Sequence, residues 1–179
     1  NFDLFKCVSP LAYFGPYSNK TSPYYRRYFK SDAADDDAYL RLVNFLELVN
    51  DNKTSIDDMA NIFDVDSFLR TYAVEVMTGN WDGTWDGNNY YLLHVGGKFK
   101  YFRHDLDIGL GSYEQLWNTD FSSKCIFSFQ EGNVFTHDNP LPPKVLASPF
   151  WRAQFIKYMV ELCTAMSSAE FMSSLYDQQ

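Results

Sequence analysis

The chain of 179 residues is 46% hydrophobic and 18% aromatic, and its formal net charge is −8. These values exclude an intrinsically disordered chain, and the length suffices for one domain with a sizeable core. The acidic balance and the lack of a basic run argue against a nucleic-acid-binding protein, since such proteins contact phosphates through Lys and Arg.

The first 31 residues show no clean hydrophobic period. Residues 24–29 form an aromatic and basic cluster, which we expect to pack its rings and to leave Arg26 and Arg27 in solvent. A phosphate contact is the alternative for this cluster, because Arg binds phosphate well. The sequence starts at Asn1 in mid-pattern, and we expect the chain to be part of a longer protein.

Two helices are predicted next. The first starts around Ala34 and has acidic residues in its first turn, where carboxylates favour the helix dipole. Its apolar stripe at helical spacing consists of Tyr39, Leu42, Val43, Leu46 and Val49. A short helix through Ile62 follows, opened by a capping arrangement of Ser55 and Asp58.

A third helix is predicted from Asp66, as its N-cap, to Thr78, and Gly79 is a typical residue just past a helix end. Glu75 is a lone acid on this helix. We expect it to be a solvated or paired surface group rather than a catalytic one.

A β-hairpin is predicted after this helix. The apolar and aromatic runs Tyr90–Val95 and Phe99–Phe102 are separated by Gly96-Gly97, at the length of a hairpin turn. The segments that precede and follow the hairpin should therefore lie close together in space.

Both segments are rich in side-chain oxygens. The polar residues are Asp82, Asp86, Asn88 and Asn89 before the hairpin, and Asp105 and Asp107 after it. Turn formation would explain any one of them, because Asp and Asn hydrogen-bond their own backbone. The whole set favours a pocket for a hard divalent cation.

The rest of the chain predicts scaffold and loop. Residues 112–143 have an irregular pattern, and a loop of this length in a compact domain is usually functional. A long helix is predicted from Pro149 to Met166, and a short one around Ser168 to Tyr176. Three cysteines fit either one disulfide with a free thiol or three buried thiols. Glycosylation sequons at Asn19 and Asn52 are compatible with secretion.

The order of motifs from Asn80 to Gly111 is specific. An Asp follows a helix end, and after a short polar loop come Asn-Asn-Tyr-Tyr-Leu, a hairpin with a Lys-aromatic strand, and Asp-Leu-Asp-x-x-x-Gly. This order resembles the CotH kinases, the spore coat protein H family of atypical protein kinases. Segments that begin at Pro10, Asp35, Asp64 and Asn139 look similar to that family as well, so the resemblance covers most of the chain.

The resemblance implies a fold and an activity. The fold would be α+β and mostly helical, like the larger, C-terminal lobe of an atypical protein-kinase-like fold, with a β-hairpin at the active site. Residues 1–179 would be a single partial domain that lacks the N-terminal lobe. The protein would use ATP and Mg²⁺, or Mn²⁺, to phosphorylate a secreted, coat or wall protein, and would itself be secreted or lie on the cell or spore surface.

The resemblance also implies a catalytic base. The catalytic base of a kinase orients the acceptor hydroxyl. Asp82 fits this role, because it directly follows the end of the helix. Asp86 is the alternative, since the gap between Asp82 and the Asn pair is longer than the family's usual one.

The ligands of the metal and the nucleotide are implied in the same way. Asn89, or its neighbour Asn88, fits the amide ligand, and Asp105 fits the second metal ligand on the nucleotide phosphates. Asp107 would share the metal or hold the loop. The Lys that contacts the ATP phosphates in kinases is expected upstream of this chain.

Two alternatives stay open. In a non-enzymatic surface adhesin or invasin of the same family, the Asp residues would at most bind calcium. A metal-dependent glycosyltransferase would use Asp105-Leu-Asp107 as a DxD motif, but the strand–helix alternation of its nucleotide-binding sheet is not evident. The sequence contains no transmembrane run, and we expect a protein substrate and a nucleotide as partners, with no nucleic acid.

Overall fold

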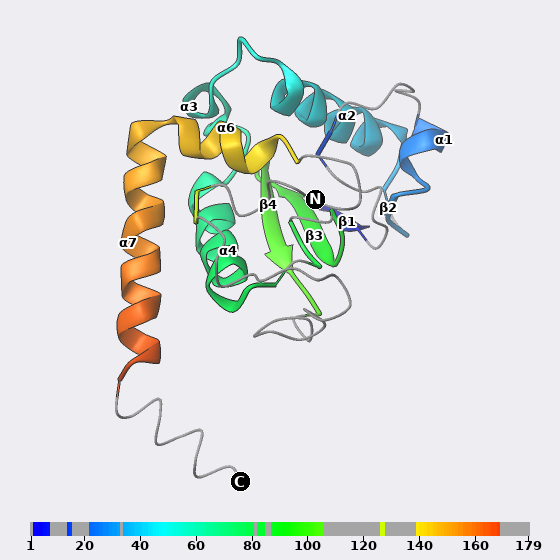
Figure 1. The fold of residues 1–179 in the computed structure, drawn as a ribbon. Helices are drawn as coiled ribbons and strands as arrows, with labels where there is room; N and C mark the ends of the chain where they lie inside the picture. Colours follow the sequence, from blue (N-terminus) through cyan, green and yellow to red (C-terminus); the bar gives the residue numbers. More distant parts are fainter. Residues whose placement is uncertain are drawn as a thin grey trace, which may run out of the picture.

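The computed structural model describes residues 2–7, 14–15, 22–32, 34–80, 82–84, 87–105, 126–127 and 139–168. The fold is α+β (Figure 1). Its helices are α1 (Ser22–Tyr25), α2 (Asp36–Asn50), α3 (Ile56–Met59), α4 (Val65–Thr78), α6 (Leu141–Ala147) and α7 (Pro149–Met166). Its strands are β1 (Phe2–Cys7), β2 (Phe29–Lys30), β3 (Tyr90–Val95) and β4 (Lys98–Arg103).

The strands form one antiparallel sheet in the order β2-β1-β3-β4. The predicted hairpin is confirmed as β3 and β4, and Val95 pairs with Lys98 across the turn. Gly96 and Gly97 both have positive φ, 58° and 79°, as a two-residue hairpin turn of this hand requires. The sheet is larger than the predicted hairpin, because β1 and β2 were not expected.

The helices follow the predicted order, with shifted ends. α2 is capped by Asp35, whose side chain accepts from the amide of Ala38 at 2.8 Å. Ser55 and Asp58 form the predicted capping box, but α3 ends at Met59. The N-cap of α4 is Asp64 and not Asp66, because the Asp64 carboxylate accepts from the amide of Ser67.

The core lies between the sheet and the helices. All five residues of the predicted α2 stripe are buried. The ring of Phe45 stacks on Phe99 of β4 at 4.6 Å, and Phe68 of α4 meets Tyr101 edge to face at 5.4 Å. α4 lies between the sheet and α7, which runs along one side of the molecule (Figure 1). α4 is therefore fixed on two sides.

The N-terminal cluster and the C-terminal segments depart from expectation in three places. Rings of the cluster are buried as predicted, but Arg26 is not a free solvent group: it lies 4.2 Å from the ring of Tyr39 and bonds Asp36. The irregular stretch ends earlier than predicted, because α6 begins at Leu141. Cys163 is exposed, so the alternative that all three cysteines are buried thiols is wrong. The helix predicted beyond Ser168 lies outside the described residues.

Candidate active site

The loop that bears Asp82 starts at a left-handed glycine. Gly79 has φ 63°, its amide donates to the carbonyl of Val76 at 3.3 Å, and the amide of Asn80 donates to that of Glu75 at 2.9 Å. This pair of bonds closes a helix and turns the chain sharply away from its axis. The predicted end of the helix is confirmed, and α4 gives the loop a rigid support.

Asp82 is held by two side-chain amides. The Nδ2 atom of Asn88 donates to Oδ1 of Asp82 at 3.0 Å, and Nδ2 of Asn89 donates to Oδ2 at 2.6 Å. These two amides therefore fix the orientation of the Asp82 carboxylate.

Two predicted site residues have a rare backbone conformation. Among the described residues other than glycine, Asn89 (φ 51°) and Asp105 (φ 59°) are the ones with positive φ. Asn and Asp tolerate this region better than other side chains, and conformations of this kind gather at functional sites. Asn89 directly precedes β3, and Asp105 lies two residues after the end of β4.

Arg103, the last residue of β4, joins the two ends. Its Nη1 donates to the carbonyl oxygens of Asn88 at 3.1 Å and Asn89 at 2.6 Å. Its Nη2 donates to Oδ1 of Asn80 at 2.9 Å and, more weakly, to the carbonyl of Asp105 at 3.4 Å. One guanidinium thus links the backbone on both sides of the hairpin.

Glu75 was predicted at the surface, and that prediction is wrong. Its side chain is 1% exposed, and its Oε1 lies 2.9 Å from Nε of Arg103. The N–H at Nε is not aligned for a hydrogen bond, so this contact is an ion pair. Oε2 accepts from the amide of Thr84 and Oε1 accepts from the hydroxyl of Tyr101, both at 3.1 Å. Burial raises the pKa of Glu75, and Arg103 partly opposes that rise.

The polar group around Glu75 extends to α6. The hydroxyls of Thr84 and Tyr101 lie 2.7 Å apart, and Tyr101 gives its proton to Glu75, so Thr84 is the donor of that pair. Asn139 is buried, donates to the carbonyl of Thr84 at 2.8 Å and accepts from the amide of Leu141 at 3.0 Å. These hydrogen bonds connect the loop that bears Asp82 to the residues before α6.

Charged residues before and after the hairpin shift the pKa of His104. Burial lowers its pKa, Lys6 and Arg103 lower it further, and Asp105 and Asp82 oppose that shift. The interactions place Asp82, Asp105 and Lys6 within electrostatic range of one imidazole. Two carboxylates that are 23 positions apart in sequence therefore both act on the same imidazole.

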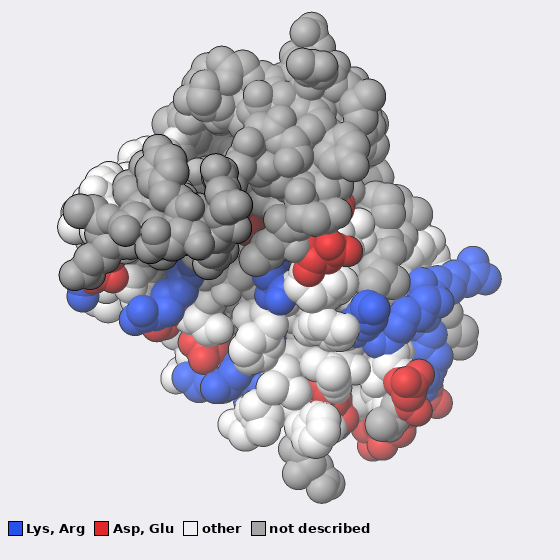
Figure 2. Space-filling model, turned by 90° about the horizontal axis from the view of Figure 1, so that it is seen from below, with Lys and Arg blue, Asp and Glu red and all other residues white. Residues whose placement is uncertain are grey.

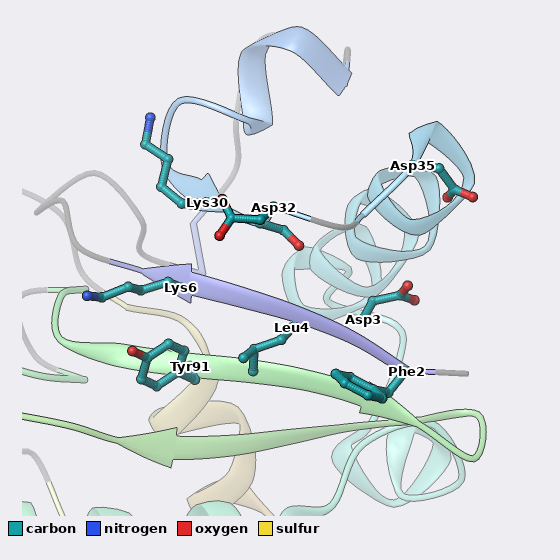
Figure 3. A pocket seen from close by; sticks show the side chains of 9 residues that line it. Phe2, Asp3, Leu4, Lys6, Lys30, Asp32, Asp35 and Tyr91 are labelled. Atoms are coloured by element: carbon teal, nitrogen blue, oxygen red, sulfur yellow. The ribbon is translucent and has the colours of Figure 1, made fainter.

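A pocket of about 810 Å³ lies beside this site over β1 and β2 (Figure 3). Its lining is of mixed charge and includes Asp3, Lys6, Lys30, Asp32, Asp35 and Tyr91. The predicted site residues do not line it. Lys6 and Tyr91 lie together at one end, and the ring of Tyr91 is 4.7 Å from that of His104. Basic and acidic side chains also lie close together on the described part of the face in Figure 2.

The structure brings together four of the predicted residues, Asp82, Asn88, Asn89 and Asp105. Asp86 and Asp107 lie outside the described residues. Within the described ranges, no three His, Cys, Asp or Glu side chains form a ready-made metal site. The buried Oδ1 of Asn88 has no hydrogen-bond partner, which leaves one acceptor oxygen beside Asp82 available.

Comparison with protein families decides the relationship. A family model described as CotH kinase protein matches residues 4–179. The chain belongs to the CotH kinase family. Membership suggests a kinase-like function, and the resemblance carried by the Asn80–Gly111 motifs is confirmed. A search of curated proteins gave no match. No helix in the part of the chain that the structure describes is long and apolar enough to cross a membrane.

Proposed function

We propose that this chain carries the catalytic part of an ATP- and Mg²⁺-dependent protein kinase that acts on secreted or surface proteins. The sheet and helices would correspond to the larger lobe of a kinase-like fold. The observation that carries the proposal is the convergence of two loops on Arg103, with Asp82 in one loop and Asp105 in the other. A kinase needs such a pair, one carboxylate for the acceptor hydroxyl and one for the metal.

The described donors fit a magnesium–nucleotide complex. Asp105 and the amide oxygen of Asn89 or Asn88 would hold the metal, and the partnerless Oδ1 of Asn88 is an oxygen of the required kind. Magnesium is usually bound by one or two carboxylates together with substrate phosphates. A site without three clustered acids is therefore compatible with it. The bound metal would neutralise charge on the phosphates during transfer.

Asp82 would act on the acceptor hydroxyl. Its two amide bonds orient the carboxylate, and an oriented carboxylate would accept the hydroxyl proton as a general base. Asn88 and Asn89 would thereby have two tasks, since their nitrogens hold the base while their oxygens are available to the metal.

The test is a phosphotransfer assay on the full-length protein with labelled ATP and either Mg²⁺ or Mn²⁺. Asp82→Asn should lower the rate by about 10²–10⁴-fold, the usual contribution of a general base. Asp105→Asn should abolish metal-dependent transfer, whereas Asp37→Asn, a change of an exposed acid in the first turn of α2, should retain it. Asp86→Asn is measured alongside, and the larger loss of rate, in Asp82→Asn or in Asp86→Asn, identifies the base.

A folded wild-type protein that neither binds Mn²⁺–ATP nor transfers phosphate would refute the kinase proposal. Calcium binding without nucleotide binding would then favour the adhesin alternative.

A further inference from the structure

Arg103 makes more contacts than an ion pair with Glu75 alone would require. Its side chain is 4% exposed, and its donors reach four oxygens in the two loops as well as the carboxylate of Glu75. Alternation along β4 explains the burial: Phe99 and Tyr101 face the core, so Arg103 does too. A planar, multidentate cation is needed here, because an ammonium cannot reach several oxygens in one plane.

Gly83 packs directly on the guanidinium. A Cβ added to Gly83 would lie 2.6 Å from Cζ, 2.8 Å from Nη1 and 2.9 Å from Nε of Arg103. No real Cβ lies so close to another heavy atom, so a side chain at position 83 would displace either the loop or the arginine. The residue after Asp82 therefore has to be glycine for the loop to pack on Arg103 in this way.

The groups that Arg103 holds are those that place the two carboxylates. It bonds the backbone of Asn88 and Asn89, whose side chains hold Asp82, and the backbone of Asp105. A shift of the guanidinium would therefore change the separation of Asp82 and Asp105.

We propose that Arg103, anchored by Glu75 and packed against Gly83, is a positioning residue that sets the separation of the Asp82 and Asp105 carboxylates and hence the affinity of the site for its metal. This inference rests on the proposed kinase function for its catalytic readout. The four hydrogen bonds of Arg103 and its ion pair all go to protein oxygens, so it would act on the metal through those groups. Its loss should act through metal affinity and turnover, and should leave the binding of the protein substrate nearly unchanged.

The experiment compares wild type, Arg103→Lys and Gly83→Ala in the full-length protein. Arg70→Lys is the matched control, because Arg70 on α4 is exposed, and its ion pair with Asp66 and its contact with the ring of Tyr158 involve neither Asp82 nor Asp105. Mn²⁺ binding is measured by electron paramagnetic resonance without nucleotide. Phosphate transfer is measured as a function of Mg²⁺ and of protein substrate, and thermal unfolding reports whether each variant is folded.

We expect Arg103→Lys to raise the Mn²⁺ dissociation constant and the half-saturating Mg²⁺ concentration by roughly ten- to a hundredfold, the usual effect of losing a residue that orients metal ligands. kcat should fall while KM for the protein substrate stays within about twofold, because uniform substrate binding is untouched. Gly83→Ala should shift metal affinity in the same direction with all charges kept, and Arg70→Lys should match wild type.

The outcomes separate the two proposals. If wild type transfers phosphate and a folded Arg103→Lys keeps the wild-type metal dependence, the positioning role is overturned and the kinase function stands. If wild type transfers none, the kinase function fails, and Mn²⁺ binding alone decides the role of Arg103: weaker binding in the variants supports it and equal binding overturns it. Should Arg103→Lys not fold, Gly83→Ala gives the same decision.

Discussion

Replacing Arg103 by Met should expose how strongly the buried ion pair is coupled. Met has a similar length but carries no charge and no donor. The Glu75 carboxylate, 1% exposed in the wild type, would keep its hydrogen bonds from Thr84 and from the hydroxyl of Tyr101 but lose the positive charge beside it. Removing one partner of a buried pair costs about 3–5 kcal/mol, because the other charge is left uncompensated. That is a large part of the roughly 5–15 kcal/mol that stabilises a domain.

A double-mutant cycle isolates the coupling. Glu75→Gln/Arg103→Met removes both charges, so the double variant should be less destabilised than the sum of the single variants, by roughly 1–3 kcal/mol. The free energies of unfolding are obtained from urea titrations followed by circular dichroism at pH 7.

The sign of the pH dependence is a second readout. Burial raises the pKa of Glu75, and Arg103 is the largest of the influences that oppose this rise, so in Arg103→Met the pKa of Glu75 should rise further, with the hydrogen bonds of Thr84 and Tyr101 still opposing it. A carboxyl with a raised pKa in the folded state binds a proton there at a pH where the unfolded chain does not. Stability then falls as pH rises from the ordinary Glu value through the folded value. The deficit of Arg103→Met against wild type should therefore shrink as pH falls below 7, and Glu75→Gln should remove the effect.

A coupling energy within about 0.5 kcal/mol of zero, the range expected of independent sites, would refute the reasoning. So would a deficit of Arg103→Met that does not change with pH. Either result would mean that Glu75 and Arg103 contribute independently.

Three further outcomes are expected. In an NMR titration, His104 should take up its proton below the ordinary His value, and Lys6→Gln should move that pKa upward, because Lys6 is one of the charges that lower it; an unchanged pKa would place Lys6 elsewhere. Asp64→Ala should lower the free energy of unfolding by about 1 kcal/mol, the usual cost of losing an N-cap, in a urea titration; a neutral result would return the cap to another residue. Gly97→Val, at φ 79°, should cost about 1–2 kcal/mol in the same assay, because a β-branched residue is strained there; a wild-type midpoint would contradict that turn geometry.

The parts of the fold with local signals were predictable from sequence. Gly96-Gly97 specified the hairpin turn, and Gly79 specified the end of α4, because in each case the backbone needs positive φ that glycine adopts without strain. α7 was predicted with its observed ends, Pro149 and Met166. Such features depend on a few neighbouring residues and on nothing distant.

The sheet was underestimated because β1 pairs with a strand about 90 positions away. Phe2 pairs with Val95 and Cys7 with Tyr90, and only Phe5 and Cys7 of β1 are buried. Burial alternates along β1, but its sequence does not, because Phe2 and Leu4 on the outward side are apolar and exposed. Non-local pairing of this kind leaves a weak local pattern.

The Glu75–Arg103 pair was missed although both positions carried a signal. Glu75 lies three residues after Tyr72 and seven after Phe68, on the buried stripe of α4, and Arg103 lies two residues after Tyr101 on the inward side of β4. Charges at inward positions of two adjacent elements should be read together as a buried pair. Glu75 was predicted by itself as a solvated or paired surface group, and no role was predicted for Arg103.

The conformation of the site also depends on this pair. Asn89 and Asp105 have positive φ, which costs of order 1 kcal/mol or more for a residue with a side chain. The carbonyls of both residues accept from Arg103, and hydrogen bonds from a charged donor contribute about 1.5–3 kcal/mol each, although the bond to Asp105 is long at 3.4 Å. The stronger bond, to Asn89, is sufficient to offset the strain of that residue, whereas Asp105 is held less tightly. We therefore expect the Asp105 side of the site to be the first to relax when Glu75 no longer anchors the guanidinium.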